Sequence, residues 1–157
     1  MKVRTALAGL TFALSLGVAA PSLAADPCVG REGPHKVLVA VTGVSPIKGE
    51  VAVTLYPDNP RRFLAPKGKL LRARVKATPQ VTEVCFWVPE PAYYAIAIYH
   101  DANGDQDFNR TIIGMPAEGF GFSNNAPTRV GLPSFESVRF RAGPGTTRVP
   151  ISMRYQR

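Results

Sequence analysis

An acidic segment near the middle of the chain has the spacing of a loop that binds a hard cation. Side chains that carry oxygen occupy alternate positions from Asp101 to Asp107. Calcium-binding loops present carboxylate and amide oxygens in this alternating pattern, and a bound Ca²⁺ removes the repulsion between neighbouring carboxylates. The candidate ligands for Ca²⁺, the last of which joins them if the chain folds back, are Asp101, Asn103, Asp105, Asp107, Asn109 and Glu118.

The segment departs from an EF-hand at two positions. Gln106 stands where an EF-hand has its glycine, and Ile112 stands where a bidentate glutamate closes the coordination shell. The same residues also suit a solvated hairpin turn, in which Asn103 and Gly104 adopt left-handed backbone and the aspartates accept hydrogen bonds from backbone amides. The sequence therefore leaves open a calcium site and a plain acidic turn.

Catalysis would require a base or a nucleophile in a defined arrangement, and the chain has two histidines, His35 and His100. Ser123 lacks the second glycine and the strand-to-helix setting of a nucleophile elbow. The alternative to a non-catalytic protein is a metal-dependent hydrolase that uses His100, Asp101 and Glu118. We favour the non-catalytic interpretation, because no spacing in the sequence brings these groups together.

The acidic segment follows one of the strands that the sequence predicts. Apolar and polar residues alternate with a period of two in several stretches rich in Val, Ile, Tyr and Thr, which Gly, Pro, Asn and Asp interrupt. Seven such stretches favour an all-β fold, an antiparallel seven-stranded β-sandwich of the immunoglobulin or transthyretin kind. The predicted strands cover residues 36–44, 50–56, 70–76, 82–88, 93–100, 137–141 and 146–155.

A long stretch without strand character separates the fifth and sixth predicted strands. It runs from Asp101 to Glu136, and apolar residues such as Ile112 and Ile113 serve as expected anchors that argue against disorder. Long loops in compact domains are usually functional, so we expect an ordered excursion that binds a ligand. The candidate ligand surface consists of His100, Phe120, Phe122, Ser123, Asn124 and Asn125.

The chain has two cysteines, Cys28 and Cys85, and neither lies in a CxxC motif. No histidine stands close enough in sequence to either of them to indicate a zinc site. In an exported protein such a pair is expected to be oxidised. We therefore predict a disulfide between Cys28 and Cys85, which on the chain-entropy model stabilises the fold by roughly 4 kcal/mol.

The first residues have the order of a secretory signal peptide. A basic start, Met1 to Arg4, precedes an apolar run that ends at Ala20, and small residues stand at Ser22 and Ala24 before the expected cleavage site. The apolar run is shorter than the ~20 residues of a membrane-spanning helix. We predict a cleaved signal peptide over residues 1–24, a single domain over residues 25–157, a periplasmic or secreted location and no transmembrane segment.

Removal of the signal peptide leaves seventeen basic residues against eleven acidic ones, a net charge of +6. Several of the basic residues fall between Arg61 and Lys76, but no aromatic residues alternate with them as in a nucleic-acid surface. The charge favours an anionic envelope partner, such as an anionic glycan or lipopolysaccharide, and disfavours nucleic acid. A solvated basic face that keeps the protein soluble explains the same pattern.

Three stretches of the chain also resemble a known family. The runs AYYAIAIYHDANGDQDFN, GMPAEGFGFSNNAP and PSFESVRF are similar to the exported bacterial proteins of domain-of-unknown-function family 2141. The resemblance extends over residues 37–153, and its most specific part is the pair His100 and Asp101 together with Glu118 to Asn125. The resemblance implies a β-sandwich and a periplasmic or secreted location, and it implies no activity, substrate or catalytic residue.

These observations together favour one hypothesis. The protein is expected to be a non-catalytic binding or structural module of the bacterial periplasm or cell envelope. Its ligand would be held by the excursion from Asp101 to Glu136, with Ca²⁺ as a cofactor that orders the acidic segment.

Overall fold

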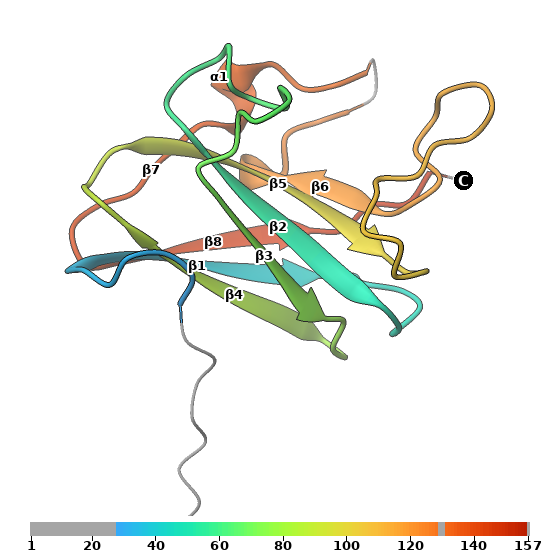
Figure 1. The fold of residues 1–157 in the computed structure, drawn as a ribbon, viewed down its shortest axis with the longest axis horizontal. Helices are drawn as coiled ribbons and strands as arrows, with labels where there is room; N and C mark the ends of the chain where they lie inside the picture. The colour runs from blue at the N-terminus through green and yellow to red at the C-terminus, as the bar shows by residue number, and fades with distance from the viewer. Residues whose placement is uncertain (1–27, 129–130, 157) are drawn as a thin grey trace, which may run out of the picture.

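The computed structural model describes residues 28–128 and 131–156, which form two β-sheets packed face to face (Figure 1). The predicted signal peptide, residues 1–24, lies outside the described residues. No helix among the described residues has the length and apolarity that a membrane span requires.

The smaller sheet has three strands in the order β4, β1, β8. Strand β1 (His35–Thr42) lies in the centre and pairs antiparallel with β4 (Val81–Val88). On its other side β1 pairs parallel with β8 (Thr146–Ser152). This parallel pair joins the first and the last of the described strands, so the two ends of the domain lie side by side in this sheet.

The larger sheet has five strands. Strands β3 (Leu71–Lys76), β2 (Glu50–Pro57), β5 (Tyr93–Asp101) and β6 (Phe120–Phe122) follow one another across it. A short strand, β7 (Phe140–Arg141), pairs with the beginning of β5. All the pairings within this sheet are antiparallel.

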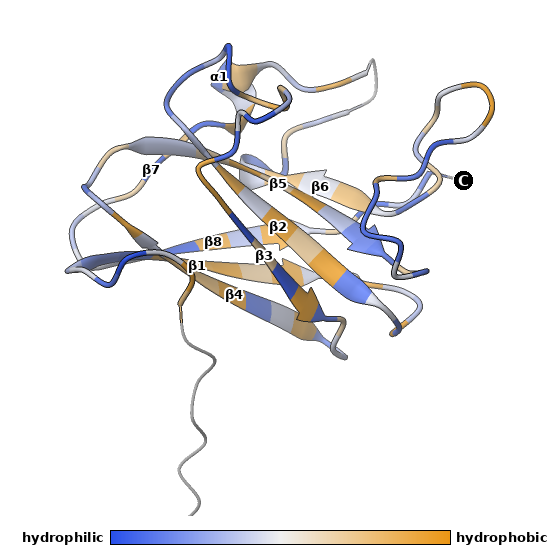
Figure 2. Ribbon diagram, in the orientation of Figure 1, coloured by the Kyte–Doolittle hydropathy of each residue, from blue (hydrophilic) through white to orange (hydrophobic). Residues whose placement is uncertain are grey.

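Period-two alternation explains the core between the sheets. Val37, Val39 and Val41 of β1 point toward the larger sheet, and all three are fully buried. Val51 and Val53 of β2 face them from the other side, in the same hydrophobic cluster. The strands that carry these residues are largely orange in Figure 2, which shows the apolar residues concentrated along the two sheets.

Strands β2 and β5 are buried on both faces, which the alternation alone does not explain. Ala52, Tyr56 and Tyr99 point away from the first core and join a second apolar cluster on the outer face of the larger sheet. Phe135 and Val138, from the helix α1 (Phe135–Val138), pack in the same cluster. Loops and a short helix therefore cover the outer face of this sheet.

The prediction of an all-β fold with two sheets is confirmed, but three of its details are corrected. The structure has eight strands, and the pairing of β1 with β8 is parallel, so the sheets are not wholly antiparallel. The predicted strand over residues 137–141 is confirmed only at Phe140–Arg141, since its first two residues end the helix α1, which Ser134 caps and which buries Phe135 and Val138 on one side. The immunoglobulin-like or transthyretin-like topology is not confirmed.

A further correction concerns the excursion. Its described part contains strand β6, the 3₁₀ helix η1 (Ser123–Asn125) and α1, all of which contact the larger sheet. Gly121 in β6 passes so close to the backbone of Ser152 that a Cβ atom would lie 2.9 Å from its carbonyl oxygen. The alternation predicted no strand here, because β6 has only three residues and a glycine at its centre.

The predicted disulfide is present. Cys28 and Cys85 are bonded, with their Cα atoms 4.5 Å apart and a sequence separation of 57. Val29 N–H also donates to the carbonyl of Cys85 at 2.9 Å, so the start of the described chain lies along β4. The disulfide thus ties the segment before β1 to an edge strand of the smaller sheet.

Candidate functional site

The register of the larger sheet aligns two rows of side chains across its outer face. One row runs through Arg72, Thr54, Ala97 and Phe122, in strands β3, β2, β5 and β6. The neighbouring row, two residues along each strand, runs through Arg74, Ala52, Tyr99 and Phe120. Each row therefore begins at an arginine on the edge strand and ends at a phenylalanine.

The first row is hollow at its centre. Thr54 and Ala97 are small, whereas Tyr56 and Tyr99 beside them are large. The outer face is thus recessed between two aromatic rings, and a cavity of about 600 Å³ lies over it. We call this cavity the outer groove. Its volume falls within the range of roughly 300–1,000 Å³ that is typical of small-molecule sites.

The excursion supplies the other walls of the outer groove. Phe108, Met115 and Pro116 from the segment after β5 face it, as does Leu132 from the segment before α1. Phe108 packs against Tyr99 and Phe120, with ring centroids 5.5 and 6.2 Å apart. The groove is therefore lined mainly by apolar and aromatic side chains, which come from the sheet and from the excursion that returns over it.

Two arginines, Arg72 and Arg110, are the charged residues that line the outer groove within the described part of the chain. Arg72 Nε donates to Thr54 Oγ1 at 2.8 Å, and the side chain lies close enough to Tyr56 to affect its ionisation. Burial raises the pKa of Tyr56, and the positive charge of Arg72 offsets part of that rise. Arg110 lies over the ring of Phe108, 5.2 Å from its centroid. The groove is therefore apolar in its walls and positive at its charged positions.

The acidic loop begins at Asp101, which is fully buried at the end of β5. Its carboxylate accepts hydrogen bonds from Gly104 N at 2.7 Å and from Gln106 N at 2.9 Å, and Arg74 Nη1 lies 3.1 Å from Oδ2. Gly49 passes against the backbone of this residue, where a Cβ atom would overlap the carbonyl oxygen of Asp101. Asp101 is therefore held in one orientation at the base of the loop.

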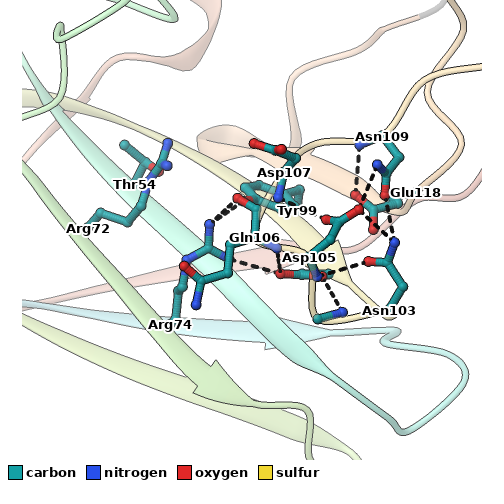
Figure 3. A network of polar contacts seen from close by, with 12 residues as sticks. Thr54, Arg72, Arg74, Tyr99, Asn103, Asp105, Gln106, Asp107, Asn109 and Glu118 are labelled. Atoms are coloured by element: carbon teal, nitrogen blue, oxygen red, sulfur yellow. Dashed lines mark hydrogen bonds and ion pairs between the residues drawn. The ribbon is translucent and has the colours of Figure 1, made fainter.

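The amide side chains of the loop gather around Asp105. Asn103 Nδ2 donates to Asp105 Oδ2 at 2.7 Å, and Asn109 Nδ2 donates to the same atom at 2.9 Å (Figure 3). The N–H of Asp107 donates to Asp105 Oδ1 at 2.9 Å. These hydrogen bonds lower the pKa of Asp105, that from Asp107 most, because they favour its charged form.

Glu118 approaches the loop from the bend that precedes β6. Its Oε2 accepts a hydrogen bond from Asn109 N at 3.1 Å. Burial raises the pKa of Glu118, and the negative charges of Asp101 and Asp105 raise it further. The chain thus folds back, as one of the predictions for the calcium ligands required.

Oxygen atoms of Asp101, Asp105 and Glu118 lie within 4.8 Å of one another, a spacing at which one cation could contact all three. Asn103 and Asn109 lie against Asp105 and offer amide oxygens once their amides turn end for end. The carboxylate of Asp107 points away from this group in Figure 3, although it belongs to the predicted set. The structure thus brings together five of the six predicted ligands around a position suited to Ca²⁺.

His100 is buried, and both of its ring nitrogens have partners. Nε2 lies 2.8 Å from the carbonyl of Lys48, and Nδ1 lies 2.8 Å from the hydroxyl of Tyr155. Since a carbonyl only accepts, Nε2 donates to it, and Nδ1 accepts from Tyr155 in the neutral tautomer. Gly119 leaves room for the Tyr155 ring, which a Cβ atom would overlap. The histidine therefore has the environment of a structural residue.

The candidate ligand surface is divided by the structure. Phe120, Phe122 and Ser123 are buried and do not form an exposed surface, although the two phenylalanine rings border the outer groove. Ser123 Oγ accepts from Ile96 N at 2.9 Å and donates to the carbonyl of Val138. The physical reason is that β6 and η1 join the larger sheet, which turns these side chains inward.

Asn124 and Asn125 are exposed, but their side chains make structural contacts. Asn124 Nδ2 donates to the carbonyl of Arg139 at 2.9 Å, and Asn125 Oδ1 accepts from Ser152 N at 2.8 Å. Both have positive φ, of 59° and 48°, a backbone conformation that asparagine tolerates better than most residues. The two consecutive asparagines are thus explained by the turn that they form in η1.

The expected anchors Ile112 and Ile113 are corrected as well. They stand at the tip of a hairpin that Thr111 N and Met115 O close at 2.7 Å, and they are 107% and 84% exposed. The orange tip of the loop between β5 and β6 in Figure 2 shows this apolar projection. The hairpin places their side chains outside the packed part of the molecule, whereas Phe108 provides the anchor.

The outer groove was not predicted from the sequence. Its small floor residues, Thr54 and Ala97, belong to predicted strands but have no signal of their own, since only the strand register sets them side by side. Arg72 was one of many basic residues in its region. The available signal was the alternation itself, which places Arg72 and Arg74 on one face of an edge strand.

Comparison with known proteins gives one match. A family model described as "Uncharacterized protein conserved in bacteria (DUF2141)" matches residues 39–150, which include the acidic loop and all the lining residues of the outer groove except Gln156. No curated protein and no solved structure matches the chain. The resemblance inferred from the sequence is therefore confirmed.

Proposed function

The chain belongs to the bacterial family DUF2141, whose description assigns no activity, and from this premise we propose that the protein is a non-catalytic binding module of the bacterial periplasm or cell envelope. The observation that carries the proposal is the outer groove. It has the size and the mainly apolar lining of a ligand site, and its residues come from the sheet and from the excursion.

The environment of His100 supports a binding role over a catalytic one. A general base needs a free ring nitrogen within reach of a substrate, and both nitrogens of His100 are engaged by Lys48 and Tyr155. Its side chain is also 1% exposed. The hydrolase that would use His100, Asp101 and Glu118 therefore has no support from this geometry.

The proposal is tested by asking whether the groove holds a ligand when the protein is purified from its own compartment. The protein would be expressed with its natural N-terminus and isolated from the periplasm, and native mass spectrometry would compare it with Ala97→Phe, which fills the floor of the groove. We expect a bound small molecule on the unchanged protein and its loss from the variant. Ala97→Leu serves if the larger side chain prevents folding.

Equal occupancy in the unchanged protein and in a folded groove-filling variant would refute the groove as the binding site. A protein that carries no small molecule in either form would count against the binding function. Circular dichroism and thermal melting would establish that each variant is folded before the comparison is made.

The acidic loop supplies the second part of the proposal, that Ca²⁺ stabilises the module. Three clustered carboxylates repel one another, and the pKa of Glu118 is raised by burial first and by the negative charges of Asp101 and Asp105 in addition. A divalent cation between them would remove the repulsion. Because the same loop leads into Phe108 of the groove wall, a bound ion would also fix that wall.

Calcium binding is tested with a matched pair of variants. Calorimetric titration of Ca²⁺ into chelator-treated protein, with thermal melts in the same buffers, should give saturable heat and a raised melting temperature. Asp105→Asn should abolish both effects, whereas Asp107→Asn, which removes the same charge two residues away, should retain them. Absence of heat from the unchanged protein, or an equal loss in both variants, would identify the loop as a plain acidic turn.

Export is the third part, and the sequence from Met1 to Ala24 supports it. Intact-mass measurement of the protein from a periplasmic fraction should give a chain that begins at Ala25. A protein that retains Met1 and stays in the cytoplasmic fraction would contradict the proposed location.

A further inference from the structure

The two arginines at adjacent outward positions of β3 differ in how their charge is balanced. Arg74 lies beside Asp101, whose carboxylate is 3.1 Å from its guanidinium, and it also donates to Tyr99 Oη and to the carbonyl of Gln106. Arg72 has no ion pair with any described residue, and the side chains beside it, Thr54 and Tyr56, are uncharged at neutral pH. An uncompensated guanidinium therefore stands at the end of the hollow row.

Among the described residues, the lining of the outer groove offers no negative charge to balance Arg72. Within residues 28–128 and 131–156, its lining includes Arg72 and Arg110 and no aspartate or glutamate. Arg110 is likewise without an ion pair in the described chain, and its Nη1 donates to the carbonyl of Gly114 at 3.1 Å. A guanidinium at an apolar site favours a carboxylate or sulfonate, with which it forms paired, charge-assisted hydrogen bonds.

The remaining walls of the groove indicate that the rest of the ligand is apolar. Tyr56, Phe108 and Phe122 offer aromatic surface, and Met115 offers an adaptable apolar side chain. A ligand that is polar throughout would leave these surfaces unused. Arg72 is an exposed residue, and a wholly apolar ligand beside it would displace water from its guanidinium and offer no charge in return, which is unfavourable.

We propose that the outer groove binds a small organic anion with one apolar body, placing the body over Thr54 and Ala97 and its carboxylate or sulfonate at Arg72. This inference rests on the proposed binding function and names the class of ligand. Because the cavity holds about 600 Å³, it suits a single chain or ring system. The guanidinium of Arg110 extends the positive field at the groove and adds to the attraction for the anion.

The test uses probes that differ in charge and share a shape. Calorimetric titration would compare naphthalene-1-sulfonate with the neutral naphthalene-1-sulfonamide, and decanoate would represent alkyl anions. The sulfonate should bind saturably and the sulfonamide at least tenfold more weakly, since one charge-assisted contact is lost. The relative affinities of the sulfonate and of decanoate distinguish an aromatic body from an alkyl one.

Matched variants locate the charge. Arg72→Gln should weaken sulfonate binding about tenfold or more, because the charged contact is removed while the hydrogen bond to Thr54 can be replaced. Arg148→Gln removes the same charge from an exposed residue of β8, in the other sheet, and should leave the affinity unchanged. Ala97→Phe should abolish binding of both anions.

Each contrary result has a distinct meaning. Equal affinity for the sulfonate and the sulfonamide overturns the inference of an anion site, while the groove remains a binding site. An equal loss in Arg72→Gln and Arg148→Gln overturns it in favour of diffuse attraction to a basic protein. Failure of both anions to bind saturably also overturns the inference. The proposed binding function is then tested by native mass spectrometry alone, which shows whether the periplasmic protein carries a small molecule.

Discussion

Arg74 Nη1 lies 3.1 Å from Asp101 Oδ2, and this contact joins the edge strand β3 to the last residue of β5. The Asp101 side chain is 0% exposed, and that of Arg74 is 18% exposed. The carboxylate belongs to the acidic loop, whereas the arginine belongs to the outer face of the sheet. The charge at the base of the predicted calcium loop is therefore already partly balanced by the fold.

Replacing Arg74 should destabilise the protein strongly. Arg74→Gln leaves the buried Asp101 without its opposite charge, and we expect the free energy of unfolding to fall by about 3 kcal/mol in urea denaturation, the lower end of the cost of breaking a buried pair. Arg148→Gln breaks an exposed pair with Glu83 and should cost less than about 1 kcal/mol. Similar losses in the two variants would show that Asp101 does not depend on Arg74.

Ser123 should prove to be a structural residue. Its Oγ satisfies Ile96 N and the carbonyl of Val138 in a fully buried position. Ser123→Ala leaves both backbone groups without that partner, so the free energy of unfolding should fall by about 2 kcal/mol. Ser152→Ala, at an exposed position of β8, should change it by less than about 0.5 kcal/mol. A stable Ser123→Ala protein with altered ligand binding would instead assign Ser123 to the site.

Alkaline pH should reveal the buried hydroxyl of Tyr94. Its hydroxyl donates to the carbonyl of Glu90 at 2.9 Å, and burial, followed by the charge of Glu90, raises the pKa of Tyr94 above 10.0. A raised folded-state pKa stabilises the fold below the pKa of the unfolded chain, and this stabilisation is lost as pH rises through the folded value. The unchanged protein should therefore lose stability above about pH 10.

Tyr94→Phe separates the two contributions of that hydroxyl. At pH 7 the variant should be less stable by about 1 kcal/mol, because the hydrogen bond to Glu90 is lost. The difference should shrink as pH rises above the ordinary tyrosine pKa, since phenylalanine cannot ionise. Urea unfolding at several pH values measures it, and a difference that stays constant with pH would contradict the assigned cause.

The disulfide should contribute substantially to stability. Cys28 and Cys85 are 57 residues apart, and a cross-link of that span lowers the entropy of the unfolded chain enough to stabilise the fold by about 4 kcal/mol. The double variant Cys28→Ala/Cys85→Ala should unfold at a correspondingly lower urea concentration. Treating the unchanged protein with reductant should give the same shift and should not affect the double variant. A double variant as stable as the oxidised protein would assign the bond no stabilising role.

The alternating pattern predicted most of the strands of the two packed sheets. Residues 50–56 were predicted from their alternation, and strand β2 covers Glu50–Pro57. The pattern failed in the first part of residues 137–141, where only Phe140–Arg141 form a strand, because a capped single turn that buries Phe135 and Val138 has too few residues to show a period. It also failed at β6, where pairing with β5 overrides the low strand propensity of Gly121.

The candidate site was predicted in part for similar reasons. Alternate oxygen-bearing residues are a local feature, so the sequence was sufficient to propose Asp101 and Asp105 as neighbours. Glu118 reaches them because the chain returns to β6, and Asp107 turns away because its backbone amide is used to hold Asp105. The sequence contained no comparable local pattern for the outer groove. Its floor and its arginine are aligned only by the register of β3, β2 and β5.

The sequence by itself determined the β-rich class, the pairing of the only two cysteines, the acidic loop and the family, because each depends on local pattern, on residue count or on similarity along the chain. Only the tertiary structure decided that Arg74 is neutralised while Arg72 is not. Both arginines lie on the same face of β3, two residues apart, but the end of β5 places a carboxylate beside Arg74, whereas β2 places the small Thr54 beside Arg72. That difference arises from contacts between strands, which no local stretch of sequence encodes.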